Sequence, residues 1–173
     1  MVGHTRLRWF LSSFGALVAA VFGAIGFWDR NRILSQPFIN DTTMWESTAR
    51  FHVWPWPYKL AVICNMPAFI GGWIIMVPIR LAWPTVGEAW DLLPSVTLAA
   101  LLWYRVASRL ETRSTIIRWT WLSAFAAASL TVVLIPMGYY TAWQLYGALM
   151  WCVAALFLRR SRAAASEVPS QLA

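Results

Sequence analysis

The chain has 173 residues, of which 60% are hydrophobic, 16% aromatic and 12% charged, and its mean hydropathy is +0.56. An average soluble domain carries about 25% charged residues, so half of that share excludes an ordinary soluble domain and an intrinsically disordered chain. Two cysteines exclude a disulfide scaffold. Composition therefore predicts a small all-α protein, a polytopic helical membrane bundle whose main solvent is lipid.

The formal net charge of +7 does not indicate nucleic-acid binding. A nucleic-acid surface needs basic residues clustered on one accessible face. Here the arginines, among them Arg8, Arg80 and Arg159, lie at the ends of apolar runs. At such positions they meet lipid headgroups and set the orientation of the helices. We therefore expect the lipid bilayer, and no nucleic acid, as a partner.

Five apolar runs follow one another along the chain. The first is bracketed by Trp9 and Trp28, has the length of one hydrocarbon core and shows no cleavage site behind it, so we interpret it as a retained helix. We expect one transmembrane helical domain over residues 1–162 and a disordered tail over 163–173. The predicted helices cover about 9–28, 60–79, 94–110, 119–135 and 141–158, with a long polar and aromatic loop over 29–59.

A kink is expected inside the second helix, at Pro67. Proline has no N–H to donate to the carbonyl of Ile63, so another group must donate to that oxygen. Asn65 lies beside the kink, where its amide makes either a hydrogen bond between helices or a contact to a ligand or ion. Gln144, near the start of the last helix, has the same two interpretations.

The third run is ambiguous, because its uncharged stretch 92–104 suits a re-entrant or interfacial segment as well as a span. Two arrangements place most Lys and Arg residues on the cytoplasmic side. One has five spans and an external N-terminus; the alternative has four spans, an internal N-terminus and a third segment that does not span. We predict the five-helix bundle. Both arrangements give a multi-pass protein of an inner or plasma-type membrane with a cytoplasmic C-terminus.

Small residues recur at four-residue spacing along the first helix, among them Gly15, Ala19 and Gly23. In a membrane, such a face lets two helices approach closely. We interpret these residues as a helix-packing face, used within the bundle or against another membrane protein.

The polar segment 29–59 holds the candidates for chemistry. An acid together with a histidine is the minimum for acid–base catalysis, and the segment contains Asp29, Asp41, Glu46 and His52. No second histidine or cysteine lies at metal-ligand spacing from His52. We therefore expect no metal and no cofactor, and interpret the segment as an interfacial loop, with the four residues as the catalytic candidates if the protein is an enzyme.

The middle of the four clear runs contains no ionisable residue, whereas proton relays and ion-coupled transporters usually place one there. The leading hypothesis is thus a non-catalytic integral membrane protein that packs against itself or serves as an accessory subunit of a membrane assembly. The alternative is a membrane-embedded enzyme or carrier for a lipid-like or quinone-like substrate, with segment 29–59 as its lid. A third hypothesis is a neutral-solute pore lined by Asn65, Thr131 and Gln144.

Overall fold

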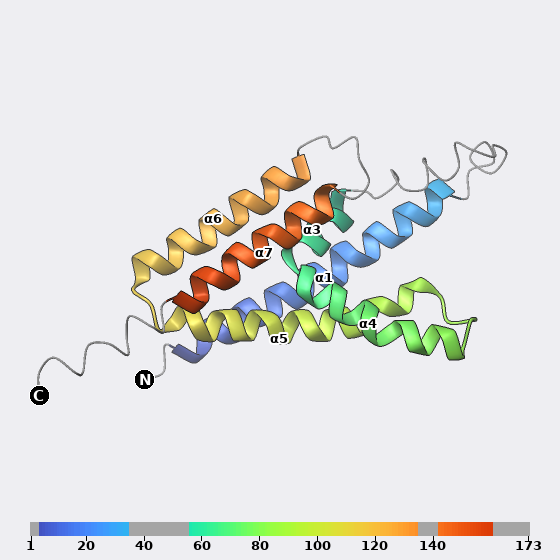
Figure 1. Ribbon diagram of the computed structural model, residues 1–173, viewed down its shortest axis with the longest axis horizontal. Helices are drawn as coiled ribbons and strands as arrows, with labels where there is room; N and C mark the ends of the chain where they lie inside the picture. Colours follow the sequence, from blue (N-terminus) through green and yellow to red (C-terminus); the bar gives the residue numbers. More distant parts are fainter. Residues whose placement is uncertain (1–3, 35–55, 135–141, 161–173) are drawn as a thin grey trace, which may run out of the picture.

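The computed structural model describes residues 4–34, 56–134 and 142–160, and every regular element in these ranges is helical, which confirms the all-α class. Figure 1 shows them as an elongated bundle. The elements are α1 His4–Leu34, α3 Trp56–Cys64, α4 Met66–Ala82, the short 3-10 helix η2 Glu88–Asp91, α5 Leu92–Glu111, α6 Thr115–Leu134 and α7 Ala142–Arg160.

Within the described ranges, one helix is long and apolar enough to cross a membrane, α1 over Arg6–Asp29. A second candidate appears if the bent pair α3–α4 is counted as one span, and α7 is a shorter apolar helix. The helical bundle is thus established, whereas five membrane spans are not.

The small-residue face of α1 lies against α5, and the two helices run antiparallel. A Cβ atom added at Gly15 would collide with the indole of Trp103, and one added at Gly23 would meet the side chain of Leu92. Ala19, between these glycines, is fully buried. Ser12 adds a hydrogen bond from its hydroxyl to a carbonyl of α5, that of Ala100, at 2.9 Å. The absence of bulky side chains along this face is what allows the close approach.

Helix α5 is longer than the predicted helix 94–110. Its 20 residues extend over about 30 Å at 1.5 Å per residue. The apolar run ends before Arg105 and Arg109, but both arginines are exposed, while Trp103, Val106 and Leu110 continue the buried face. Because the charged side chains point away from the bundle, they do not end the helix.

Ion pairs lie at both ends of α5. Arg80 of α4 pairs with Asp91, immediately before the first turn. Arg8 of α1 pairs with Glu111, in the last turn, and its guanidinium also lies 5.9 Å from the centre of the Tyr104 ring. The pairs thus tie α5 to α4 at one end and to α1 at the other.

The helix predicted over 60–79 with a kink at Pro67 is two helices, because the chain breaks at Asn65 and bends by 94° between α3 and α4. Asn65 leaves the helical conformation at φ −127° and ψ 26°, and Pro67 follows in the first turn of α4, where its missing N–H costs nothing. The carbonyl of Asn65 accepts the backbone N–H groups of Ala68 and Phe69, which starts the new helix. The proline therefore begins a helix and does not kink one.

Both outer ends of the α3–α4 pair point toward the same end of the bundle (Figure 1). Trp56, at the start of α3, contacts the second half of α1 through the Phe22 ring, 6.0 Å between ring centres. Arg80, near the end of α4, reaches the start of α5. The break at Asn65 lies beside Trp103, in the middle of α5. The pair thus enters the bundle to half its length and returns.

Candidate functional site

The polar group at the centre of the bundle is Asn65, whose side chain is fully buried. Its Nδ2 donates a hydrogen bond to the carbonyl of Ala61 at 3.0 Å, and its Oδ1 accepts one from Nε1 of Trp103 at 2.8 Å. The carbonyl of Ile63, which lacks a donor because of Pro67, accepts a hydrogen bond from Nε1 of Trp151 at 2.8 Å. Two indoles, from α5 and α7, therefore satisfy the groups that the helix break exposes.

Aromatic contacts hold these two indoles in position. The ring centres of Trp103 and Trp151 are 5.9 Å apart, and Phe125 of α6 lies edge-on against both, at 5.4 and 5.0 Å. Trp121 stacks on Phe125 at 5.2 Å. Asn65 thus makes a hydrogen bond between helices inside a closed aromatic cluster, and a role in holding α3–α4 accounts for its position.

Substitution of Trp103 by Phe should lower the stability of the bundle. Trp103→Phe keeps an aromatic ring but removes the N–H, so that the buried Oδ1 of Asn65 loses its donor. We expect a loss of about 1 kcal/mol in the free energy of unfolding, the usual size for a hydrogen bond to a buried group. Thermal unfolding in detergent measures this. Trp119→Phe, at a side chain that is 65% exposed, is the control and should leave the transition unchanged. Equal transition temperatures for Trp103→Phe and Trp119→Phe would contradict the role of the Trp103 N–H as the donor to Asn65.

Of the four acid–base candidates, the structure describes Asp29 alone. Asp29 lies in α1 and is half-buried. Asp41, Glu46 and His52 lie outside the described residues. In the part of the chain that the structure describes, no three His, Cys, Asp or Glu residues come together in a way that could hold a metal ion.

Gln144 lines a groove of about 670 Å³, which we call the amphipathic groove, bounded by α3, α4, α7 and the start of α5. Its polar side chains are Asp91 and Ser95, where α5 begins, Gln144, near the start of α7, and Tyr58, near the start of α3. Its apolar side chains include Val62 and Met66, beside the break between α3 and α4. Polarity thus changes along this groove from one end to the other.

Ser95 is the residue of the amphipathic groove that sequence reasoning missed. It is 1% exposed, and within the described chain its hydroxyl has no hydrogen-bond partner. Asp91, one helical turn earlier, pairs with Arg80 through Oδ2, but its Oδ1 is also buried without a partner. The Nε of Arg80, in the same ion pair, is likewise buried without a partner, and the Ser95 hydroxyl lies against Gly72 of α4. The available signal was a serine four residues after an aspartate in an apolar run.

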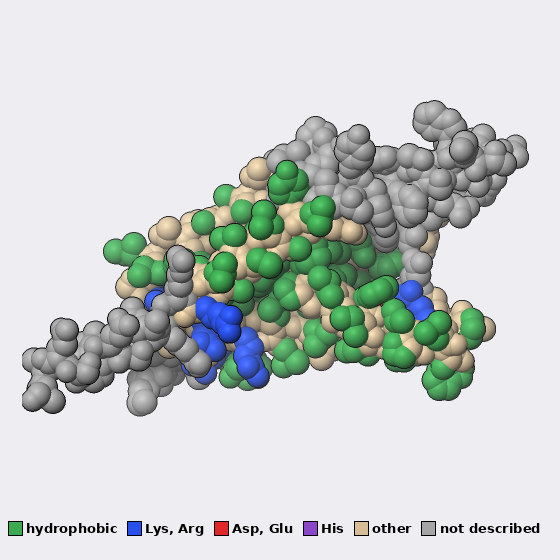
Figure 2. Space-filling view, in the orientation of Figure 1, with side chains coloured by type: hydrophobic (Ala, Val, Ile, Leu, Met, Phe, Trp, Pro, Cys, Tyr) green, Lys and Arg blue, Asp and Glu red, His purple; other side chains and the backbone are tan. Residues whose placement is uncertain are grey.

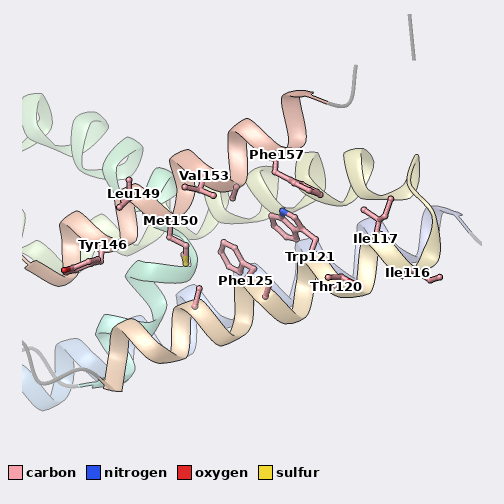
Figure 3. A pocket seen from close by; sticks show the side chains of 13 residues that line it. Ile116, Ile117, Thr120, Trp121, Phe125, Tyr146, Leu149, Met150, Val153 and Phe157 are labelled. Atoms are coloured by element: carbon pink, nitrogen blue, oxygen red, sulfur yellow. The ribbon is translucent and has the colours of Figure 1, made fainter. Parts of the chain in front are cut away.

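A second groove, of about 730 Å³, lies between α6 and α7 (Figure 3), and we call it the apolar groove. Figure 3 shows Trp121 and Phe125 of α6 and Met150 and Phe157 of α7 directed into the space between the helices. Hydrocarbon makes up nearly all of the lining, with hydroxyls only on Thr120 and Tyr146. This surface offers shape and apolar contact but no reactive group.

The three residues of the pore hypothesis do not line a common path. Asn65 borders a small cavity of about 140 Å³, Gln144 borders the amphipathic groove, and Thr131 is exposed on α6, with its hydroxyl bonded to the carbonyl of Ala127. The described residues therefore give the pore hypothesis no support.

Comparisons with models of protein families, with curated proteins and with solved structures find no match for this chain.

Proposed function

We propose that this protein is a non-catalytic, multi-pass protein of an inner or plasma-type membrane that serves as an accessory subunit of a larger membrane assembly. The observation that carries the proposal is the distribution of polarity. Large apolar side chains are exposed on every α-helix of the described ranges, whereas Asn65, Ser95 and Ser129 are buried. A protein that folds in water has the opposite arrangement.

The outer face of α1 illustrates this distribution with five exposed side chains, Phe10, Phe14, Leu17, Val21 and Ile25. Soluble monomers rarely expose a contiguous apolar patch above a few hundred Å². Figure 2 shows hydrophobic side chains spread over the visible face and not confined to one patch. Lipid tails are the solvent in which such a surface is stable, because the backbone polar groups are already paired inside the helices.

The ends of the bundle match the two edges of a bilayer. Five exposed indoles lie near the ends of the bundle, Trp9 and Trp119 where α5 terminates and Trp28, Trp83 and Trp90 where α5 begins, while Trp56 of α3 and Trp73 of α4 are exposed as well. Tryptophan is enriched at both membrane–water interfaces, and the length of α5, about 30 Å, is that of one hydrocarbon core. The exposed arginines of α5 are long enough to reach the interface from the last turns of the helix.

The proposed arrangement has four spans, α1, α5, α6 and α7, with α3–α4 as a re-entrant pair. Length supports it, since α5, α6 and α7 have 19 or 20 residues each, although among the described helices only α1 is by itself also apolar enough to span. This arrangement differs from both sequence-based arrangements, since it makes the second run, and not the third, the segment that returns. It places the start of α1 and the end of α7 on the same side.

Basic residues indicate which side that is, because cytoplasmic loops are enriched in Lys and Arg. In Figure 2 the blue side chains gather mainly at the end where α7 terminates. Toward this end lie Arg6, Arg8, Arg105, Arg109, Arg113, Arg118, Arg159 and Arg160, against Arg30, Arg32, Lys59 and Arg80 toward the other. The proposed topology thus has a cytoplasmic C-terminus.

The apolar groove is the surface that suits a partner subunit. Ala124 and Ala128 leave room on α6, in a groove that larger side chains such as Trp121 of α6 and Phe157 of α7 also line. Small residues beside large ones allow an apolar transmembrane helix to approach closely, and van der Waals contact of this kind drives helix association in lipid. The proposed partner is therefore an apolar helix of another membrane protein.

Membrane fractionation followed by native electrophoresis tests the proposal. We expect the protein to stay in the membrane pellet after alkaline carbonate washing and, after extraction in a mild detergent, to migrate in an assembly larger than the monomer. Ala128→Trp fills the apolar groove and should release the monomer. Ala127→Trp places the same side chain at an exposed position outside that groove and should leave the assembly intact. Release by carbonate would contradict membrane insertion, and a monomer from the unmodified protein would contradict the accessory role.

A further inference from the structure

We propose that the last three turns of α5 bind an anionic phospholipid of the cytoplasmic leaflet. Arg105, Ser108 and Arg109 hold its phosphate, and its acyl chains lie against Leu101 and Leu102, toward the middle of the helix. We call the surface formed by these five residues the α5 face. The inference rests on the membrane placement proposed above, but not on the accessory role.

The three polar residues of the α5 face lie on one side of the helix. They are three and four positions apart, and helical residues at this spacing are neighbours, with about 5–6 Å between their Cβ atoms. Arg105 and Arg109 are exposed, and Ser108 is half-buried. None of the three side chains makes a hydrogen bond or an ion pair within the described ranges. Two guanidinium groups and one hydroxyl are thus available to a single group that accepts hydrogen bonds.

The charge at this end of the bundle favours an anion. Among the described residues, Glu111 is the only acid toward this end, and it is already paired with Arg8. Figure 2 shows blue side chains gathered there. Arg105 and Arg109 are therefore two like charges four positions apart, a spacing at which they repel each other. A phosphate between them removes this repulsion, and each planar guanidinium can donate two parallel hydrogen bonds to its oxygens.

The apolar part of the α5 face indicates a lipid and not a soluble phosphate. Leu101, one turn before Arg105, is 57% exposed, and Leu102 beside it is half-buried. Leu101 lies about 6 Å from Arg105 along the axis, toward the middle of α5. The face thus changes from basic to apolar in the direction in which a lipid of the cytoplasmic leaflet points its chains. That leaflet carries anionic lipids, whereas a zwitterionic lipid would bring a cation of its own to the arginines.

Native mass spectrometry of the full-length protein, released from detergent micelles, tests the inference. The probe is dioleoylphosphatidylglycerol, and dioleoylphosphatidylcholine has the same chains with a zwitterionic head. We expect one molecule of the phosphatidylglycerol to bind about tenfold more tightly than the phosphatidylcholine, because only the first brings a net negative charge to the arginines. Glycerol 3-phosphate has a phosphate but no acyl chains, and even in large excess it should not displace the lipid.

Two double variants of equal charge locate the site. Arg105→Gln with Arg109→Gln should weaken phosphatidylglycerol binding at least about tenfold. The control, Arg6→Gln with Arg159→Gln, removes two exposed arginines of α1 and α7 at the same end and should weaken binding less than about twofold. Neither pair should lower the temperature of thermal unfolding, since these side chains make no ion pair within the described ranges. Ser108→Ala removes the hydroxyl alone and should weaken binding about threefold.

Three results would overturn the inference: equal binding of the two phospholipids, displacement of the phosphatidylglycerol by glycerol 3-phosphate, or equal losses of binding in the two double variants. Equal losses would mean that the charge of the whole end, and not the α5 face, attracts the lipid. Any of these results, obtained with a protein that carbonate does not release from membranes, would refute the lipid site and leave the membrane placement standing. Release by carbonate would refute the placement itself.

Discussion

A cysteine at Asn31 and one at Thr85 will be labelled from the same side of the membrane, and a cysteine at Ser114 from the opposite side. All three positions are exposed. Asn31 lies near the end of α1, Thr85 lies between α4 and η2, and Ser114 lies between α5 and α6. The expectation follows from the α3–α4 pair, because its two outer ends point toward the start of α5 while α5 itself crosses to the other side.

The measurement uses a membrane-impermeant maleimide on intact cells and on inverted vesicles. The background is Cys64→Ala with Cys152→Ala, which removes both native thiols. In intact cells we expect full labelling at Asn31 and Thr85 and none at Ser114, with the reverse pattern in inverted vesicles. The effect is all or none, since the bilayer excludes the charged reagent.

Two other patterns would contradict the re-entrant pair. Labelling of Asn31 and Thr85 from opposite sides would mean that α3–α4 crosses the membrane as one bent span. Labelling of Thr85 and Ser114 from the same side would mean that α5 does not span.

The variant Gly72→Ala will be far less stable than its neighbour Gly71→Ala. A Cβ atom at Gly72 would collide with the hydroxyl of Ser95 and would lie 3.0 Å from its backbone nitrogen and 3.1 Å from its Cα atom. Backbone atoms of a helix cannot turn aside, so α4 and α5 must separate. Overpacking of this kind costs about 1–3 kcal/mol.

Gly71→Ala is the matched control because its new Cβ atom would meet the side chain of Leu98 alone, at 2.8 Å from Cδ1. A leucine side chain can rotate, and alanine favours the helix over glycine by about 0.5–1 kcal/mol. In thermal unfolding in detergent, we expect Gly71→Ala to have a transition temperature close to that of the unmodified protein and Gly72→Ala to have a clearly lower one. Equal losses for both variants would show that the close approach of α4 and α5 at Ser95 is not what requires glycine.

The sequence by itself determined the helical class and the positions of most helices. The helix predicted over 119–135 corresponds to α6, Thr115–Leu134, and the one over 141–158 to α7, Ala142–Arg160. These features depend on residues within a few positions of one another, where apolar runs and chain breakers act locally. The need for a donor to the carbonyl of Ile63 was also local, because it follows from Pro67 alone.

The partners of the central polar groups were decided by the tertiary structure. Trp103 is 38 positions from Asn65, and Trp151 is 88 positions from Ile63. In a chain that is apolar on nearly all helix faces, the periodicity of hydrophobic residues does not indicate which face is packed. The sequence therefore offered no signal that these two indoles, and no others, would reach the break.

The course of the second run was likewise decided by tertiary contacts. Pro67 predicts an interruption of the helix. The bend of 94° and the course of α4 along α5, however, depend on the close packing of Gly72 against Ser95 and on the ion pair between Arg80 and Asp91. These contacts join segments that no local rule connects. Length and hydropathy report only how many apolar residues a run contains. A run of this length fits a straight span and a returning pair equally well, and the contacts with neighbouring helices decide between the two.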